Sequence, residues 1–431
     1  MWELVAALYP ICRSITGDGV RETLRLVQRL IPLETHEVPT GTAVLDWTVP
    51  REWNVRDAFI ATPDGRRVVD FRASSLHVMS YSVPVRRRMT LSELQPHLFS
   101  LPEHPDWIPY RTSYYKEAWG FCLPERVRRR LTGAVEYEVC IDSTLADGAL
   151  TYGEYVLPGA TDDEVLLSCH CCHPSLANDN LSGIAVATYL ARALTGRSHR
   201  YSYRFLFLPG TIGPITWLAR NEQSATRIKH GIVLACAGDR GPSTYKRSRR
   251  GNAEIDRAVE HVLRHSGAPY AVVDFAPYGY DERQYCSPGF DLPVGSLSRT
   301  PHGRYPEYHT SADNLELVRP ECLQDTLSKL LAIVDVLERD GTYVNTSPKG
   351  EPQLGRRGLY RALGGVADAT EMEHALLWVL NQCDGSHTLL DVAERADIPF
   401  SAIARAADAL LAAGLLRPTA ATALPPHAVH Q

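Results

Sequence analysis

The sequence predicts an α/β protein: a domain with a mainly parallel sheet, interrupted by a β-rich insert and followed by a small helical domain. Three patterns lead to this prediction. From about residue 151 onward, short and continuously apolar segments alternate with amphipathic helical patterns, which is typical of a parallel sheet covered on both faces. Residues 41–150 show short β-rich runs between turn signals, and residues 356–417 show helical patterns only.

The elements of the α/β domain follow from these patterns. Strands are expected where a short apolar run is bounded by turn residues, at 164–169, 203–208, 231–237 and 292–297. Helices are expected where apolar residues recur every three to four positions, at 181–194, 215–221, 255–265 and 315–339. Residues 1–31 also carry helical spacing around a break at 16–19. We therefore expect residues 1–40 and 151–347 to form one domain, with residues 41–150 inserted into it.

The C-terminal part of the chain predicts a helix-turn-helix or winged helix. Two helical patterns, at 388–396 and 400–413, are joined by a short turn at 397–399. A DNA-reading helix carries Lys or Arg along its length, but here Arg405 is offset by Asp408. We therefore expect no nucleic-acid partner, and packing, protein contact or homo-oligomer formation through this domain instead. The Ala/Pro-rich residues 418–431 are expected to be disordered.

Composition and charge exclude several classes of protein. The formal net charge of −5 argues against a general nucleic-acid or membrane-surface role. No apolar run reaches the roughly 18 residues that span a bilayer, and the N-terminus lacks the features of a signal peptide. We expect a cytoplasmic protein without membrane partners. There, the ten cysteines are expected to be mostly buried thiols, with a few candidates for metal ligation.

Metal-binding residue types gather in SCHCCHPSLANDNLSG, residues 168–183. The carboxyl ends of parallel strands meet at one edge of a sheet, so His170 and Asp179 are expected to lie side by side there. Both residue types bind Zn²⁺. Alternatively, His170 is an ordinary hydrogen-bonded residue, or the His-Cys-Cys-His cluster is a thiolate site. Cys171 and Cys172 would point to opposite sides of an extended strand, which disfavours two thiolates on one ion.

The motif NDNLSG resembles a signature of the co-catalytic zinc aminopeptidases, a family that also includes glutamate carboxypeptidases and glutaminyl cyclases. Further stretches, among them LYPICRSITGDGVRETL, IPYRTSYYKEAWGFC and PEYHTSADNLEL, are similar to a bacterial aminopeptidase-like group with a β insert and a C-terminal winged helix. The resemblance covers about residues 1–417. It implies a zinc-exopeptidase fold in which His170, Asp179 and His309 hold zinc. His173, three residues after His170, is either a reserve ligand or, with Pro174, a constraint on the loop.

The sequence also departs from that family at the catalytic positions. After the second strand, zinc aminopeptidases carry two glutamates, a general base and a zinc ligand, where this chain has Gly210 and Thr211. At the end of the third strand the resemblance implies an acidic ligand, which is either Asp239 or replaced by Cys236. A second zinc would then lack ligands, so we expect one zinc ion.

Other residues are candidates for acid–base work and substrate contact. Asp281 and Glu282 lie in a loop that matches one lining the family's site, and they are the best replacements for the missing base. Alternatively, they form structural ion pairs with Arg283 or Arg299. Arg283 and the basic run at 246–250 could hold an anionic group, although charge runs are more often solvated faces. We assign substrate contacts to Gly210, Thr211, Arg283 and Tyr308.

These observations favour a zinc-dependent aminopeptidase-like enzyme that acts on an amide beside a free amine, in a small or peptide-like substrate. Two alternatives remain because the usual catalytic glutamate is Gly210. One is a non-hydrolytic zinc-dependent cyclase or acyltransferase of a biosynthetic pathway. The other is a catalytically inactive binding protein.

Overall fold

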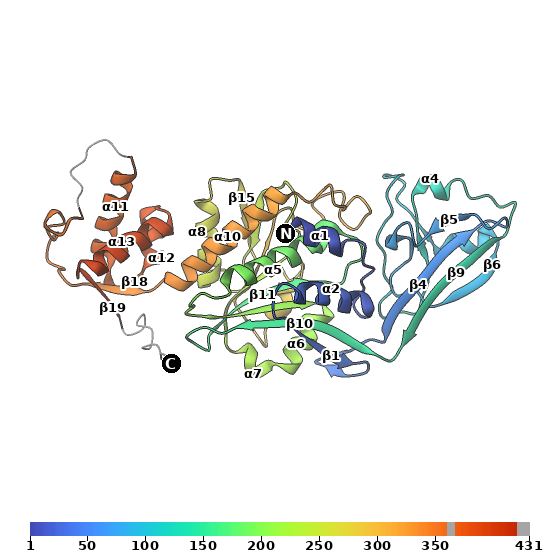
Figure 1. The fold of residues 1–431 in the computed structure, drawn as a ribbon, viewed down its shortest axis with the longest axis horizontal. Coiled ribbons are helices and arrows are strands. Elements are labelled where there is room, and N and C mark those ends of the chain that lie inside the picture. The colour runs from blue at the N-terminus through green and yellow to red at the C-terminus, as the bar shows by residue number, and fades with distance from the viewer. Residues whose placement is uncertain (360–366, 420–431) are drawn as a thin grey trace.

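Three units lie in a row along the long axis of the molecule (Figure 1). The computed structural model describes residues 1–359 and 367–419. An α/β unit forms the centre, a β-rich unit lies at one end and a small helical unit at the other. Most of the predicted disordered tail, from residue 420 on, lies outside the described residues.

The central sheet has eight strands, and its middle is parallel as predicted. The strand order is β1-β10-β12-β11-β13-β16-β14-β15. The strands are, in the same order, Glu34–Pro39, Ala149–Leu157, Ser202–Leu208, Glu164–His170, Ile228–Leu234, Val294–Ser298, Ser243–Lys246 and Tyr270–Val273. β12, β11, β13 and β16 run parallel. β10 pairs antiparallel with β1 and β12, and β14 pairs antiparallel with β16 but parallel with β15. The sheet is therefore mixed, with antiparallel pairing toward both edges.

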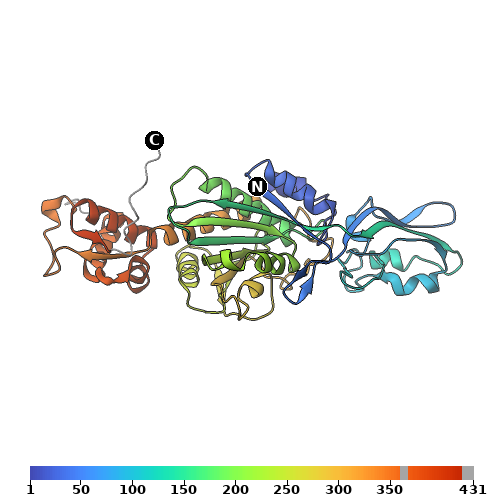
Figure 2. The ribbon, with the colours of Figure 1, turned by 90° about the horizontal axis from the view of Figure 1, so that it is seen from below.

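Helices cover both faces of this sheet (Figure 2). They are α1 (Trp2–Leu8), α2 (Asp18–Gln28), α5 (Gly183–Leu194), α6 (Ile212–Arg220), α7 (Glu222–Ala225), α8 (Glu254–Arg264), α9 (Glu282–Tyr285) and α10 (Pro320–Arg339). Side chains of β11 alternate between the two apolar cores: Val165 and Leu167 pack with α5 and α10, whereas Leu166 packs on the opposite face with α6. Because both faces are covered, β11 and β12 are buried along their whole length.

The β-rich unit is built on a four-stranded antiparallel sheet of order β5-β4-β9-β6. These strands are Arg67–Asp70, Glu52–Ala61, Tyr137–Ala146 and Val85–Met89. Smaller elements complete the unit: β7 (Leu98–Phe99), β8 (Phe121–Cys122), α3 (Leu91–Leu94) and α4 (Glu125–Arg128). The hairpin of β2 (Ala43–Val44) and β3 (Trp47–Thr48) packs against α6 of the central unit. β9 ends two residues before β10 of the central sheet begins, so a short connection joins the two units.

The C-terminal unit has the predicted winged-helix arrangement. It consists of α11 (Ala367–Gln382), α12 (Leu389–Ala396), α13 (Phe400–Ala412) and a sheet of β17 (Thr342–Asn345), β18 (Asp384–Thr388) and β19 (Leu416–Pro418). β17 pairs with both other strands, so we place the start of this unit at β17 rather than at residue 356. Arg257 of α8 joins it to the central unit through ion pairs to Asp391 and Glu394 at 2.6 and 2.5 Å.

No helix in the described part of the chain is long and apolar enough to cross a membrane. All ten cysteines are free thiols, and nine of them are buried. The cysteines therefore behave as the sequence predicts.

Candidate metal centre

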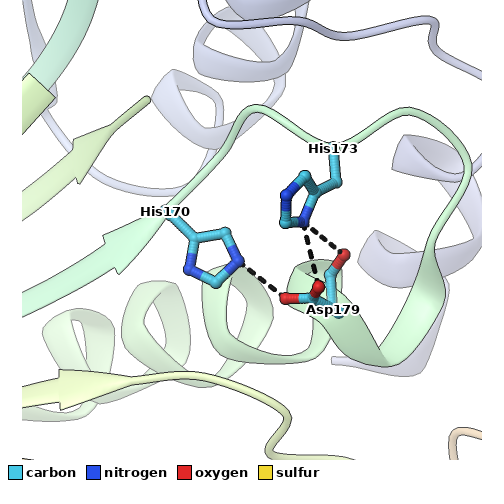
Figure 3. A group of neighbouring side chains, drawn as sticks. All are labelled: His170, His173 and Asp179. Carbon is cyan, nitrogen blue, oxygen red and sulfur yellow. Dashed lines mark hydrogen bonds and ion pairs between the residues drawn. The ribbon is translucent and has the colours of Figure 1, made fainter. Parts of the chain in front are cut away.

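The end of β11 and the start of α5 bring His170 and Asp179 together (Figure 3). His170 is the last residue of β11, and its Nε2 lies 2.7 Å from Oδ1 of Asp179. Asp179 belongs to a turn, residues 177–182, directly ahead of α5. Both side chains are buried. The predicted juxtaposition of these two residues is present in the structure.

The small polar residues around Asp179 bind the turn to the end of β13. Asn178 accepts a hydrogen bond from Gly238 N at 2.9 Å, and Asn180 donates one to Leu234 O at 2.9 Å. Ser182 accepts one from Ala237 N at 2.8 Å. A side chain at Gly183 would lie 2.4 Å from Oδ1 of Asn180, so only glycine permits this approach. The motif NDNLSG therefore holds the turn in place and leaves the side chain of Asp179 free to face the histidines.

Two further histidines reach the carboxylate of Asp179. Nδ1 of His173, in the loop after β11, lies 3.1 Å from Oδ2. Nε2 of His309, in the loop before α10, also lies 3.1 Å from Oδ2. His309 has a positive φ of 57°, a backbone conformation that L side chains seldom adopt and that is found more often at functional sites.

A second carboxylate supports the turn from behind. Asp313 is fully buried and accepts hydrogen bonds from the backbone N–H groups of Asn178, at 2.6 Å, and Asp179, at 3.0 Å. These bonds orient Asp179 toward the histidines, because its backbone cannot rotate without breaking them. Buried partners of this kind commonly fix the geometry of metal ligands.

The donor atoms suit a zinc ion. Those of His170, His173 and Asp179 all lie within 4.8 Å of one another, and in residues 1–359 and 367–419 they form the one such group found. Two imidazole nitrogens and a carboxylate oxygen are donors that Zn²⁺ binds. His309 approaches the same carboxylate oxygen as His173. The group therefore contains the reserve ligand His173, whereas the expected ligand His309 lies outside it and contacts the carboxylate of Asp179.

The electrostatics of the cluster favour ligands without a bound proton. Burial lowers the pKa of His170 and of His309. Burial also opposes ionisation of Asp179, but the neighbouring histidines outweigh it and hold the pKa of that carboxyl well below its usual range. For His173 burial is outweighed by Asp179, which raises the pKa of its imidazole. A metal competes with protons for such groups, so the raised pKa of His173 opposes metal binding, whereas the lowered pKa values of His170, His309 and Asp179 favour it.

The end of β13 does not bring Asp239 into this group. Asp239 accepts hydrogen bonds from Asn178 Nδ2 at 2.9 Å and from Thr300 Oγ1 at 2.5 Å, so its two oxygens are used in holding the loops. Cys236 lies earlier on the same segment, where its Sγ is 2.8 Å from the Tyr280 hydroxyl. Burial raises the pKa of the Cys236 thiol, which keeps it protonated. Asp239 thus serves as a structural acceptor in this structure.

The end of β12 carries the largest departure from the resemblance. Gly210 lies beside both His170 and Asp281: a Cβ added to Gly210 would be 3.2 Å from His170 Cβ and 3.2 Å from Asp281 Oδ1. Asp281 is buried, and its Oδ2 has no hydrogen-bond partner among the described residues. Burial, together with the neighbouring Glu282 carboxylate, raises the pKa of Asp281 to about 7. Thr211, next in the chain, precedes α6 and is half-buried.

Most of the other charged candidate residues near this loop are bound in ion pairs. Glu282 is fully buried in an ion pair with Lys246, and Arg299 pairs with Asp325 at 2.5 Å. Arg283 has a buried Nε without a hydrogen-bond partner. The remaining arginines of the basic run, at 247, 249 and 250, all pair with carboxylates. Asp281 is therefore the carboxylate of this loop that carries no ion pair in the described part of the chain.

Aromatic side chains surround the histidines, and one of them comes from the β-rich unit. The Tyr110 ring meets those of His173 and His309 edge-on, at centroid distances of 5.2 and 5.1 Å. Tyr308 stacks on His309 at 3.9 Å, and Tyr280 stacks on His170 at 5.4 Å. Tyr308 is among the predicted site residues, whereas Tyr110 and Tyr280 are not. The sequence pattern that could have indicated Tyr110 and Tyr280 is their place in the tyrosine-rich motifs IPYRTSYY and YGYDERQYC.

The fold is that of the zinc aminopeptidases. The crystal structure of BSAP, a zinc aminopeptidase from Bacillus subtilis, matches with a TM-score of 0.56 and 13% sequence identity, over 78% of this chain and 93% of that chain. An identity this low shows the shared fold alone. The predicted aminopeptidase-like fold is thereby confirmed, with a winged helix-turn-helix family matching residues 341–418.

The chain belongs to the family described as a domain of unknown function, DUF4910, whose model matches residues 2–340. A curated relative from Clostridium acetobutylicum is 52% identical over 417 residues, which cover 97% of this chain and 96% of that protein. Its name refers to polysaccharide biosynthesis and to an aminopeptidase-like domain. A crystal structure from the same species, described as a peptidase, matches with a TM-score of 0.93 at 50% identity, over 97% of this chain and 96% of that chain.

Proposed function

We propose that this protein is a zinc-dependent enzyme that cleaves an amide beside a free amine, in a small or peptide-like substrate used in polysaccharide biosynthesis. The observation that carries this proposal is the convergence of His170, His173 and His309 on the buried carboxylate of Asp179. Three imidazoles around one carboxylate exceed what a structural hydrogen bond requires. The zinc aminopeptidase fold and the name of the 52% identical relative support the chemistry and the pathway respectively.

His170, His173, Asp179 and His309 are the residues that would hold the zinc ion. When bound at such a set, zinc polarises a carbonyl and lowers the pKa of water. Tyr308 and Tyr110 pack against the His309 ring and restrict its orientation. The aromatic rings also exclude water from one side of the histidines, which strengthens electrostatic interactions there.

Asp281 is the residue that moves the proton. Its carboxylate lies against Gly210. Gly210 is the residue that stands where zinc aminopeptidases carry their catalytic glutamate. In the proposed reaction, Asp281 takes a proton from the attacking water as the new C–O bond forms. It then delivers that proton to the leaving amine nitrogen as the C–N bond breaks. A pKa of about 7 suits both directions of transfer near neutral pH.

Acyl transfer to an acceptor other than water is the second candidate reaction. It is favoured by Gly210, because this chain lacks the general base for hydrolysis that zinc aminopeptidases carry at that position. The same Asp281 would then take the proton from the acceptor's hydroxyl or amine. Hydrolysis and transfer differ only in which nucleophile forms the new bond to the acyl carbon.

The experiment that tests the proposal combines metal analysis with product analysis. Purified protein should contain about one zinc per chain. With zinc bound, it should convert members of a panel of aminoacyl amides and aminoacylated amino sugars, followed by mass spectrometry with and without added acceptors. His309→Ala should lower both zinc content and turnover. Wild-type protein that binds no zinc in a micromolar titration would refute the proposal.

A further inference from the structure

A buried arginine from the N-terminal segment contacts the loop that carries His173. Arg13 lies between α1 and α2, and only 1% of its surface is exposed. Its Nε donates to the carbonyl oxygen of His173 at 2.9 Å, across 160 positions of the chain. Its Nη1 donates to the carbonyl oxygen of Leu8 at 2.7 Å and to Thr23 Oγ1 at 3.3 Å. One guanidinium therefore joins the two N-terminal helices to the candidate metal loop.

Burial of the Arg13 guanidinium carries a high desolvation cost for a residue whose role is only structural. It forms no ion pair in the described part of the chain, and its Nη2 has no hydrogen-bond partner. Burial lowers the pKa of its guanidinium to about 10. A buried cation without a carboxylate is costly to remove from water, and replacing such a contact by apolar packing is often neutral or stabilising, so Arg13 is unfavourable as a contact for stability alone.

The surrounding packing fixes Arg13 in its place. A Cβ on Gly19 would lie 2.0 Å from the carbonyl oxygen of Cys12 and 3.1 Å from Arg13 Cα, so α2 presses directly against this segment. The loop itself is held a second time through Ser175, whose Oγ donates to Tyr9 O at 3.0 Å and contacts Ser75 Oγ at 2.7 Å. The backbone of His173 is thus held between an arginine and a serine anchor.

We infer that Arg13 is a positioning residue of the zinc site: it fixes the backbone of His173 and thereby sets the imidazole against Asp179. This inference rests on the proposed function, since it assumes that His173 is a zinc ligand. Lysine could not replace Arg13, because its single nitrogen cannot direct separate donors at Leu8 O and His173 O along a rigid planar fork.

The test is a zinc titration against a competing chelator, with the full-length protein. Arg13→Lys should weaken zinc affinity roughly 10–100-fold, the range found when groups that orient metal ligands are removed. Arg204→Lys is the matched control, because Arg204 is also buried but pairs with Glu164 and Glu154 in the sheet. It should lower the melting temperature and leave zinc affinity unchanged.

A double-mutant cycle decides whether Arg13 acts through His173. In a His173→Ala background, Arg13→Lys should cause no further loss of zinc affinity. Full additivity of the two changes, or an unchanged affinity in Arg13→Lys, would overturn the inference while the wild-type zinc site stood. Wild-type protein without zinc would instead refute the proposed function.

A milder variant covers the case in which Arg13→Lys does not fold. Thr23→Val removes one acceptor of the guanidinium and keeps the size of the side chain. It should weaken zinc affinity about threefold in the wild-type background and not at all in the His173→Ala background, a small share of the range given above. An equal effect in both backgrounds would overturn the inference.

Discussion

Two neighbouring strand ends of the same sheet differ in how closely their residues follow the zinc aminopeptidase pattern. At the end of β11, His170 and the turn with Asp179 form the arrangement that the zinc aminopeptidase resemblance implies, down to the glycine that admits Asn180. At the end of β12, one strand away, the two expected acidic residues are Gly210 and Thr211. Asp281, from a distant loop, lies against the glycine instead.

In the proposed mechanism, metal binding and proton transfer therefore come from separate segments of the fold. The proposed metal ligand Asp179 depends on a turn that a substitution would loosen, because the side chains of Asn178, Asn180 and Ser182 hold it by hydrogen bonds to backbone groups. A proton-transferring carboxylate needs only to reach one point in space, so a different segment can supply it. The predictions below test this separation, from the largest expected effect to the smallest.

Removal of the shared carboxylate should have the largest effect. Asp179→Ala should abolish zinc binding, because Asp179 contacts His170, His173 and His309 at once. The loss should exceed the roughly 10–100-fold expected for groups that only orient ligands. The control is Asp239→Asn, which removes the carboxylate that lies outside the group and should leave zinc affinity within a few-fold of wild type. Equal losses in the two variants would contradict the assignment of Asp239 as a structural acceptor.

Asp281→Asn should separate the two functions. We expect turnover to fall by about 10²–10⁴, the usual contribution of a positioned acid or base, while zinc affinity stays the same. Turnover measured on zinc-loaded protein with the substrate found in the panel checks this. Glu282→Gln is the matched control, because Glu282 is equally buried but bound to Lys246. A larger loss of turnover in Glu282→Gln than in Asp281→Asn would reassign the proton transfer.

Gly210→Glu should show whether the two strand ends can be restored to the family pattern. A side chain at 210 meets Asp281 and His170 at contact distance, so the single variant should lose at least about tenfold in native turnover. It should gain no cleavage of simple aminoacyl-anilides. The double variant Gly210→Glu, Asp281→Gly removes the clash and should recover part of the turnover. Full activity in Gly210→Glu alone would show that position 210 is remote from the reaction.

The pH dependence of stability should have the smallest effect on the zinc site, because it concerns the Asp281 carboxyl alone. The folded protein raises the pKa of Asp281 from 3.8 to about 7, so folding is favoured while this carboxyl keeps its proton. Its contribution is complete below about pH 4 and is lost as pH rises toward 7. Asp281→Asn should therefore gain unfolding free energy relative to wild type across that window, at up to about 1.4 kcal/mol per pKa unit. Parallel denaturant titrations of both zinc-free proteins check this, and a constant difference would refute the shift.

Much of the fold could be predicted because its strands and helices have unambiguous local patterns. The buried strands β11 and β12 and the helices α5 and α13 are within a few residues of their predicted bounds. The strands β14 and β15 at one end of the sheet were not predicted. Both have only four residues. β14, with the sequence STYK, is mostly buried but not apolar, and the edge strand β15 is partly exposed, so neither shows the continuous apolar run that marks a central strand.

The sequence by itself determined the α/β fold, the winged helix and the pairing of His170 with Asp179, because periodicity and the order of strand ends are properties of the chain alone. Only the tertiary structure decided which carboxylates are bound in ion pairs and which remain available for proton transfer. Asp281 and Glu282 are adjacent and chemically alike, yet Glu282 pairs with Lys246 whereas Asp281 packs against Gly210 and carries no ion pair in the described part of the chain. Tyr110 and Arg13 likewise reach the histidines from more than 60 positions away. Such contacts depend on the packing of distant segments, which no local pattern encodes.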